Sequence, residues 1–448
     1  MSKTSGVYHA RPPRNVYVHC GTSVEYLADL NASIPGVQYY AERALLLAER
    51  DDVVCVTDEI DSHYLDYLAE IGIGPAAANL LVASRFDNSD PMQPLWRRLL
   101  SSPEALDALG CLIQRSGAAD IHPFIATRGQ FELGEALQLR SGVPVRVNGG
   151  DPAVVAYADF KHHVRAKAIE LGIPVAAGEV VDLGPANRLH PAEAMLRDAM
   201  ERQIRLTGRV IVRGTSGAAG SSTFAVETSE QIAWLAHRLA SGRENRIYLV
   251  EAMVDMLLSP NVQMHVDRGV RAIRCVGMTD QRWEHALVHG GNLYPSRASR
   301  RSEMLGWSQQ LAEWLRTLGF VGLAGFDYVE HMDVFGQTQA FLAELNPRIN
   351  GATYPLRLRR RLNVSQREAG YPEVQAFTSG TIHTEARSFA ELREIWGDRL
   401  FSTETGTGLV PYIPGLLRFG KCAVVALAAS REHADELYEE AGAVAEAV

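Results

Sequence analysis

The chain has 448 residues, of which 46% are hydrophobic and 22% charged, and its formal net charge is −9. This composition excludes a mainly disordered chain, and the acidic balance argues against nucleic acid or an anionic membrane surface as a partner. At about 150 residues per domain, the length predicts roughly three domains.

The cysteines and the N-terminus indicate the compartment. The 5 cysteines lie far apart in sequence and show no zinc-ligand spacing. An odd cysteine count in a chain of this length favours reduced thiols. The first fifteen residues contain no apolar signal-peptide core, and no apolar run approaches the roughly 18 residues of a membrane span. We therefore expect a globular cytoplasmic protein. The sequence leaves a homodimer open.

Short apolar runs alternate with helical patterns in the N-terminal third. The predicted strands are 15–20, 52–57, 79–84 and 122–127, with a helix at 103–115. This alternation predicts a parallel α/β layer of Rossmann-like type. No GxGxxG follows the first strand, so the dinucleotide fingerprint is missing. Gly149-Gly150-Asp151-Pro152 predicts a turn and a domain boundary.

The rest of the chain predicts mixed helices and strands. Helices are expected at about 160–171, 192–206 and 302–318. Strands are expected at about 209–213, 223–227, 247–253, 262–266, 324–330 and 339–346. After about Phe401, strand-rich segments and a helix from Arg431 indicate a small separate α/β appendage. The expected domains are 1–152, 153–390 (lobes 153–254 and 255–390) and 391–448.

The segment Gly325–Pro355 carries the most informative pattern. Two apolar stretches flank a turn that contains Gly336, so they predict an antiparallel hairpin. Asp327 lies on one strand and Glu344 and Asn346 on the other, and residues two apart in a strand share a face. Two carboxylates and an amide oxygen on one face form a hard-oxygen site suited to magnesium. Arg348 follows directly and offers a planar cation for a phosphoryl oxygen.

The loop Gly214–Ser222 has the composition of a phosphate-binding loop. Its glycines permit close backbone approach, and its hydroxyls and backbone N–H groups can surround phosphates. The loop lacks the GKS or GKT ending of a Walker A motif and lies between two strands. These features predict a hairpin lid over bound phosphates, and Arg213, at the end of the leading strand, would point a positive charge towards the same phosphates. A solvent loop is the alternative.

In these motifs the chain resembles the ATP-grasp superfamily of carboxylate–amine ligases. The matching pieces are FKHHVRAKAIELGIPV, VIVRGTSGAAGSST, IYLVEAMV, GLAGFDYV and FLAELNPRINGATYP, in the family's order across Lys161–Pro355. Together with the tail GLVPYIPGLLRFGKCAVVAL, the arrangement looks most like the pheganomycin-type peptide ligases. The resemblance implies an α/β (α+β) ATP-grasp fold with an N-terminal Rossmann-like pre-ATP-grasp domain and a small C-terminal α/β appendage.

The resemblance implies roles for individual residues. Lys161, one of only four lysines in the chain, matches the first ATP-phosphate lysine, and Arg213 stands where the family usually has a second. Asn261 lies near the position of a ribose-binding acid, and Arg348 matches the residue that faces the transferred phosphoryl group. Loop residues expected at the phosphates are Gly217, Gly220, Ser221 and Ser222. Hinge residues expected at adenine are Glu251, Ala252, Met253 and Val254. The implied magnesium ligands are Asp327, Glu344 and Asn346.

The implied activity is ADP-forming ligation that uses ATP and Mg²⁺. A carboxylate, expected to belong to an amino acid, would become an acyl phosphate that the amine of a peptide attacks, a reaction suited to peptide natural-product (antibiotic) biosynthesis. The candidate substrate residues are Arg357, Arg297 and Asn292. The alternative for each arginine is a solvated surface position, and the alternative for Asn292 is an ordinary turn. Alternative functions are a phosphotransferase, a carboxylate–thiol ligase and a non-enzymatic ATP-binding module.

Overall fold

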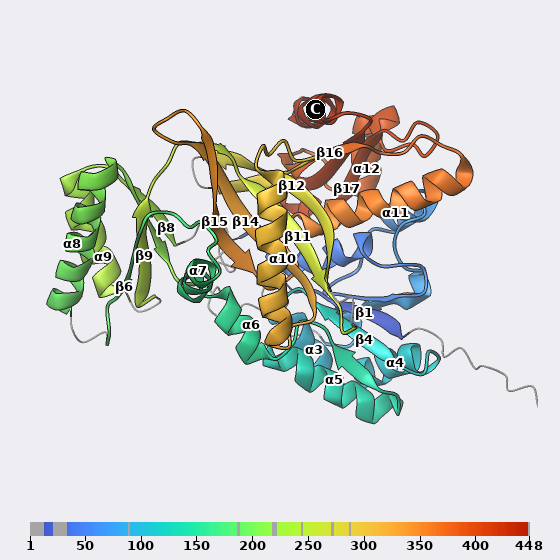
Figure 1. Ribbon diagram of the computed structural model, residues 1–448. Coiled ribbons are helices and arrows are strands. Elements are labelled where there is room, and N and C mark those ends of the chain that lie inside the picture. The colour runs from blue at the N-terminus through green and yellow to red at the C-terminus, as the bar shows by residue number, and fades with distance from the viewer. Residues whose placement is uncertain are drawn as a thin grey trace, which may run out of the picture.

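Strands and helices fold into three sheets in the computed structural model, which describes residues 13–20, 34–87, 90–185, 189–216, 222–242, 245–269, 273–285 and 288–446. Figure 1 shows that the four-stranded sheet and its two helices form a lobe on one side of the larger sheet, while the N-terminal layer lies below. Among the described residues, no helix is long and apolar enough to cross a membrane.

The N-terminal sheet is parallel and has the strand order β3-β2-β1-β4-β5. Its strands are β1 (Arg14–Val18), β2 (Val53–Val56), β3 (Leu80–Val82), β4 (Ala119–Pro123) and β5 (Val145–Val147). One face buries Val16, Val18 and Ile121 against helices that include α3 (Leu95–Ser101), α4 (Pro103–Gln114) and α5 (Arg128–Ser141). The predicted Rossmann-like layer is confirmed.

The predicted strand 122–127 is misplaced, because β4 ends at Pro123. Proline has no backbone N–H with which to continue a sheet ladder, and Pro123 makes the last pairing of β4, with Val18. Two helices, α6 (Pro152–Asp159) and α7 (Lys161–Glu170), then lead into the next sheet. The Asp151 side chain caps α6 by accepting a hydrogen bond from the Ala153 amide at 2.7 Å.

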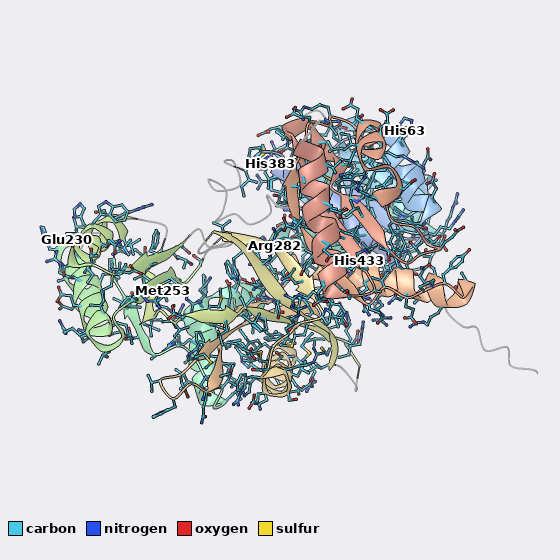
Figure 2. The ribbon with its side chains drawn as sticks, turned by 90° about the horizontal axis from the view of Figure 1, so that it is seen from above. His63, Glu230, Met253, Arg282, His383 and His433 are labelled. Carbon is cyan, nitrogen blue, oxygen red and sulfur yellow. The ribbon has the colours of Figure 1, made fainter. Side chains whose placement is uncertain are left out.

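The four-stranded lobe is antiparallel and has the order β6-β9-β7-β8. It contains β6 (Gly178–Asp182), β7 (Val210–Gly214), β8 (Thr223–Val226) and β9 (Ile247–Ala252). The helices α8 (Leu189–Thr207) and α9 (Ser229–Ser241) cover one face, where Leu196 and Leu235 pack against Val210 and Val250. In Figure 2, Glu230 and Met253 mark this lobe, which projects away from the rest of the chain.

The nine-stranded sheet forms the centre of the molecule. Its strands are β10 (Met256–Leu258), β11 (Pro260–Val266), β12 (Ile273–His285), β13 (Val288–Tyr294), β14 (Gly322–Met332), β15 (Thr338–Asn346), β16 (Ala376–His383), β17 (Gly408–Tyr412) and β18 (Lys421–Ala428). Helix α10 (Arg301–Thr317) buries Leu311 and Leu315 against Val262 and Phe326 of this sheet.

The C-terminal strands belong to this same sheet. The sequence pattern predicts a separate appendage, but β18 lies between β16 and β17 and is buried along almost its whole length. The apolar run 422–428 is therefore covered by a neighbouring strand on each side and is buried on both faces of the sheet. Two further helices complete this part, α12 (Phe389–Trp396) and α13 (Arg431–Glu446).

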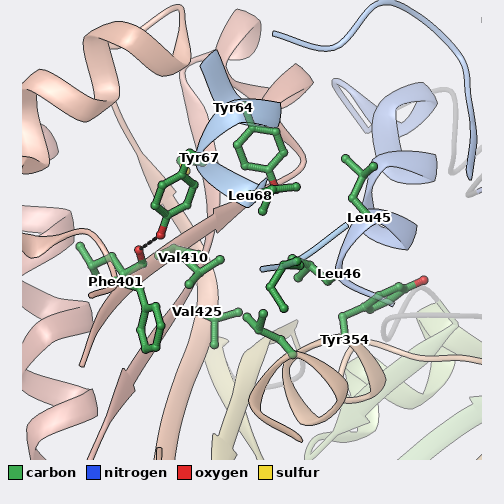
Figure 3. Packing of buried hydrophobic residues seen from close by; sticks show 14 of the residues in the cluster. Leu45, Leu46, Tyr64, Tyr67, Leu68, Tyr354, Phe401, Val410 and Val425 are labelled. Atoms are coloured by element: carbon green, nitrogen blue, oxygen red, sulfur yellow. Dashed lines mark hydrogen bonds between the residues drawn. The ribbon is translucent and has the colours of Figure 1, made fainter. Parts of the chain in front are cut away.

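One hydrophobic core joins the C-terminal part to the N-terminal layer. Figure 3 shows Leu68 of α2 (Ser62–Glu70) with Leu46 of the 3-10 helix η3 (Val37–Leu46), Tyr354 of α11 (Thr353–Ala369), Val410 and Val425. Tyr64 and Tyr67 of α2 donate hydrogen bonds to the carbonyls of Pro411 and Leu409 at 3.1 and 3.0 Å. Residues more than three hundred positions apart thus share one packed interior.

The substitution Leu68→Ala tests this shared core. Leu68 is 1% exposed, so we expect truncation to lower the free energy of unfolding by about 2–5 kcal/mol through lost burial and a residual cavity. The matched control Leu139→Ala removes a side chain that is 86% exposed and should change it by less than about 0.5 kcal/mol. Urea titration of both variants measures the difference, and equal effects would contradict the core assignment.

Candidate active site

The pairing of β14 with β15 brings the predicted acidic residues together. Asp327 lies opposite Glu344 in the antiparallel ladder, and the register shifts at the next residue of β14. On the other side of β14, strand β11 places Asn261 opposite Asp327. Asn346 lies two residues beyond Glu344 on β15, so the predicted hairpin assembles Asp327, Glu344 and Asn346 in one patch.

Side-chain amides surround the Asp327 carboxylate. Its Oδ1 accepts hydrogen bonds from Asn261 Nδ2 and from Gln281 Nε2, the latter at 2.7 Å. Its Oδ2 accepts from Asn346 Nδ2 at 2.8 Å, and Asn346 Oδ1 in turn accepts from Arg348. Asn261 therefore lies in the acidic cluster itself, a placement that the ribose assignment did not anticipate. The sequence pattern also gave no indication of Gln281.

Glu344 is paired with the predicted phosphate lysine. Lys161 Nζ lies 2.8 Å from Glu344 Oε1, and the lysine side chain is only 7% exposed. Lys161 occupies the first turn of α7, and its backbone N–H donates to the carbonyl of Thr215 at the base of the glycine-rich loop. The start of α7 thereby connects the loop to the acidic cluster.

The two carboxyl groups differ in their pKa shifts. Burial and the nearby charge of Glu344 raise the pKa of Asp327 to about 7. Burial also acts to raise the pKa of Glu344, but the charge and hydrogen bond of Lys161, together with the charges of Arg348 and Arg213, outweigh it and hold the pKa below its ordinary value. A second cation at Asp327 would favour its ionised form in the same way.

The donor set fits a magnesium ion. Among the described residues, no three His, Cys, Asp or Glu side chains are placed to hold a metal together. Asp327 and Glu344 supply two carboxylates, and the third protein oxygen would come from the Asn346 amide. Magnesium in protein sites commonly takes one or two carboxylates and completes its shell with water and substrate phosphates. Two carboxylates and one amide oxygen are compatible with such a shell, and the assignment of these residues as magnesium ligands stays a prediction.

Arg348 lies beside this cluster and is 9% exposed. Its Nη2 is 3.8 Å from Asp159 Oδ1 at the end of α6, and its guanidinium carbon lies 6.0 Å from the centre of the Phe124 ring. Arg348 therefore connects the acidic cluster with the chain that leaves β4, and it carries a positive charge close to the carboxylates.

Glu251 of the predicted hinge forms buried ion pairs with two arginines. Glu251 is 1% exposed, and its Oε1 accepts from Arg165 at 2.6 Å while its Oε2 accepts from Arg213 Nε at 2.9 Å. Arg213 also donates to the carbonyl of Ala343, next to Glu344, at 2.8 Å. Both carboxylate oxygens of Glu251 thus bind arginines, an arrangement that the sequence did not indicate. Nothing in the local sequence around Arg165 marks it as a partner.

The hinge backbone is also hydrogen-bonded within the lobe. The Ala252 N–H donates to Ala177 at 2.7 Å, the Met253 N–H donates to Arg209 at 3.2 Å, and Val254 is half-buried. This part of the chain connects β9 to the large sheet, so the predicted adenine hinge lies where the two sheets meet.

Within the glycine-rich loop, the structure describes the base, where residues 214–216 face Ser222. Gly214 N–H donates to the Ser222 carbonyl at 2.9 Å, and Ser222 Oγ donates to the Ser216 carbonyl at 3.0 Å. A Cβ on Gly214 would lie 2.8 Å from Asn245 Nδ2, so a larger residue here would displace the Asn245 side chain, whose Oδ1 accepts from the Ser216 backbone. Predicted phosphate contacts at Gly217, Gly220 and Ser221 fall outside the described residues.

The three predicted substrate residues do not lie together. Arg357 lines a cavity of about 400 Å³ that also includes Arg348. Arg297 lines a different cavity of about 420 Å³ and pairs with Glu432. Asn292 is buried at 3% exposure, and its backbone carbonyl and N–H both bond to Ser379 Oγ.

Comparison with known proteins identifies the fold. Residues 41–139 match the family model described as the pre ATP-grasp domain. The chain is also similar to biotin carboxylase from Campylobacter jejuni in complex with β,γ-ATP (13% identity, TM-score 0.56, 96% of this chain and 90% of that one). The fold is the ATP-grasp fold with a pre-ATP-grasp domain.

Two N5-carboxyaminoimidazole ribonucleotide synthetases show the same similarity. One is an ADP complex (11% identity, TM-score 0.53, covering 96% of this chain and 97% of that one). The other is from Thermus thermophilus (13% identity, TM-score 0.52, covering 96% and 98%). No curated protein matches the sequence.

The substitution Glu251→Gln tests the buried ion pair. It leaves two largely buried arginines without their shared carboxylate, so we expect the free energy of unfolding to fall by about 3–5 kcal/mol. The control Glu179→Gln breaks an exposed pair with Arg202 in the same lobe and should cost less than about 1 kcal/mol. Chemical denaturation compares the two, and a small effect at Glu251 would refute its structural role.

Proposed function

We propose that this protein is an ATP-dependent, ADP-forming ligase that joins a carboxylate to an amine. The observation that supports it best is the acidic cluster of Asp327, Glu344 and Asn346, with Lys161 and Arg348 beside it. The fold is shared with proteins solved with ADP or β,γ-ATP, which supports ATP as the energy source.

Each group in the cluster has a chemical role in this proposal. Asp327, Glu344 and Asn346 would hold magnesium, which neutralises charge on phosphate oxygens when it is bound. Lys161 and Arg348 would hold the transferred phosphoryl group and stabilise the charge that develops on its oxygens. Glu251 would fix Arg213 near β15, since the guanidinium contacts both Glu251 and the Ala343 carbonyl.

The proposed reaction has two steps. A carboxylate oxygen of the acid attacks the γ-phosphorus of ATP, and the bond to ADP breaks to leave an acyl phosphate. The amine then attacks the carbonyl carbon, the carbon–oxygen bond to phosphate breaks, and the nitrogen loses a proton to give the amide. Neither step requires a side-chain nucleophile. The loop that begins at Gly214 would exclude water from the acyl phosphate.

We further propose that the ligase acts on an amino-acid carboxylate and a peptide amine, as the pheganomycin-type peptide ligases do. The support is the combined resemblance of ELNPR (Glu344–Arg348) and the C-terminal tail. The cavity beside Arg348 has the volume expected for a small-molecule ligand, about 400 Å³. Such an enzyme would serve peptide natural-product biosynthesis.

The nucleotide product tests the class of reaction. Incubation with ATP, Mg²⁺, a panel of amino acids and hydroxylamine should release ADP and form hydroxamates, because hydroxylamine traps an acyl phosphate. Chromatography of the nucleotides and colorimetric detection of hydroxamate measure both products. Formation of AMP and pyrophosphate would contradict the proposal, and ADP formation without hydroxamate would point to a phosphotransferase.

The substitution Glu344→Gln tests the metal assignment. It removes one of the two carboxylates while preserving shape, so we expect turnover to fall by about a hundredfold or more and the apparent affinity for Mg²⁺ to weaken. The control Glu313→Gln changes an exposed glutamate on α10 and should leave turnover unchanged. Magnesium titration of ADP release distinguishes them, and full activity of Glu344→Gln would refute the assignment.

A further inference from the structure

The cavity beside Arg348 lies between the N-terminal layer and the large sheet. One wall is the face of the parallel sheet opposite its helix-covered core, with Asn15 and Tyr17 of β1 and His122 of β4. The opposite wall belongs to α11. Arg348 also lines the cavity, and its guanidinium donates a hydrogen bond to Asn346 of the acidic cluster. A ligand in this cavity can thus place one end at the site of phosphoryl transfer.

Helix α11 presents a row of arginines to this cavity. Arg357, Arg360 and Arg361 are three and four residues apart, so they lie on one face of the helix, and all three line the cavity. Arg361 donates to the carbonyl of Ala48 and is thereby bound to the protein. The arginine row gives this wall a concentrated positive charge.

Four acidic and imidazole side chains line the cavity, those of Glu49, Asp52, His122 and His265, and His265 pairs with Asp267. The Asp52 carboxylate accepts from Asn15 at 2.9 Å and from the Glu49 backbone at 2.8 Å. His122 contacts Asn15 at 2.9 Å and stacks on Tyr17 with ring centres 5.1 Å apart. Burial lowers the pKa of His122 to about 4, so the imidazole is neutral near pH 7.

Arg357 differs from these groups. Across the part of the chain that the structure describes, no hydrogen bond or ion pair engages its guanidinium, although the residue is half-buried. Burial lowers the pKa of Arg357, because it removes solvation from the charged form, and the nearby Tyr17 and Glu49 only partly oppose this shift. A desolvated guanidinium is stabilised by an anion, and a carboxylate can accept two parallel hydrogen bonds from it.

We propose that this cavity binds the acid substrate and that the acid carries a second carboxylate, held by Arg357. The carboxylate to be activated would lie at the Arg348 end, and the second would lie against α11. This inference rests on the proposed function and narrows it, since it names small dicarboxylic acids, including acidic amino acids, as the substrate class.

Matched acid pairs test this selectivity. Succinate and succinamate, glutarate and glutaramate, adipate and adipamate, and glutamate and glutamine differ within each pair by one carboxylate. With ATP, Mg²⁺ and hydroxylamine, we expect at least one dicarboxylate to exceed its amide partner by about tenfold or more in kcat/KM. Equal or better turnover of the monoamides would overturn the second-carboxylate proposal and leave the ligase function standing.

Variants of Arg357 separate recognition from folding. Arg357→Gln should raise KM for the preferred dicarboxylate by about tenfold or more and leave KM for its monoamide within about threefold. Arg357→Lys keeps the positive charge but loses the forked pair of donors. Its KM for the dicarboxylate should lie between those of the native protein and Arg357→Gln. Arg367→Gln, on the same helix but exposed and paired with Glu373, is the control. An unchanged dicarboxylate KM in the folded Arg357 variants would overturn the proposal.

Calorimetric titration of the same acids into the nucleotide-free protein gives a readout that needs no turnover. Binding of a dicarboxylate that Arg357→Gln abolishes would support the cavity assignment. If that binding occurred while every acid failed to yield ADP and hydroxamate, the proposed function would fail and the anion site would remain. Absence of binding and turnover for all the dicarboxylates would overturn the site itself.

Discussion

The structure of the site depends on the antiparallel pairing that sets Asp327 opposite Glu344. Two carboxylates brought together in a partly buried patch repel each other, and each loses solvation by water. Lys161 pairs with Glu344, while Asn261, Gln281 and Asn346 donate hydrogen bonds to Asp327. These partners come from four separate segments, so the balance of charge at one strand pair requires several parts of the fold to converge there.

Buried charges that need partners also connect the lobe of residues 178–252 to the large sheet. Arg213 of β7 binds Glu251 of β9 and reaches the carbonyl of Ala343 on β15, while Arg165 of α7 binds the other oxygen of Glu251. A carboxylate that is 1% exposed thus holds two arginines that come from different elements. Under the proposed function, such a connection would help to place the loop that begins at Gly214 over the proposed metal site.

Much of the hairpin could be predicted because its signals are local. The turn at Gly336 and the two-residue spacing of Glu344 and Asn346 fix their relative positions within one short segment. Asn261 and Gln281 could not be predicted as partners of Asp327, since their contacts depend on pairings between strands distant in sequence. The C-terminal residues were expected to stand apart, yet β18 is enclosed by β16 and β17. Local pattern does not specify such long-range neighbours.

The central claim is that the acid attacks the γ-phosphorus, and isotope transfer tests this most directly. The acid is labelled in its carboxylate with oxygen-18, and the enzyme is supplied with ATP, Mg²⁺ and hydroxylamine. Mass spectrometry of the released phosphate should find one labelled oxygen for each hydroxamate formed, because the oxygen that attacks phosphorus leaves with it. Unlabelled phosphate alongside product, or label found in AMP, would contradict the acyl phosphate route.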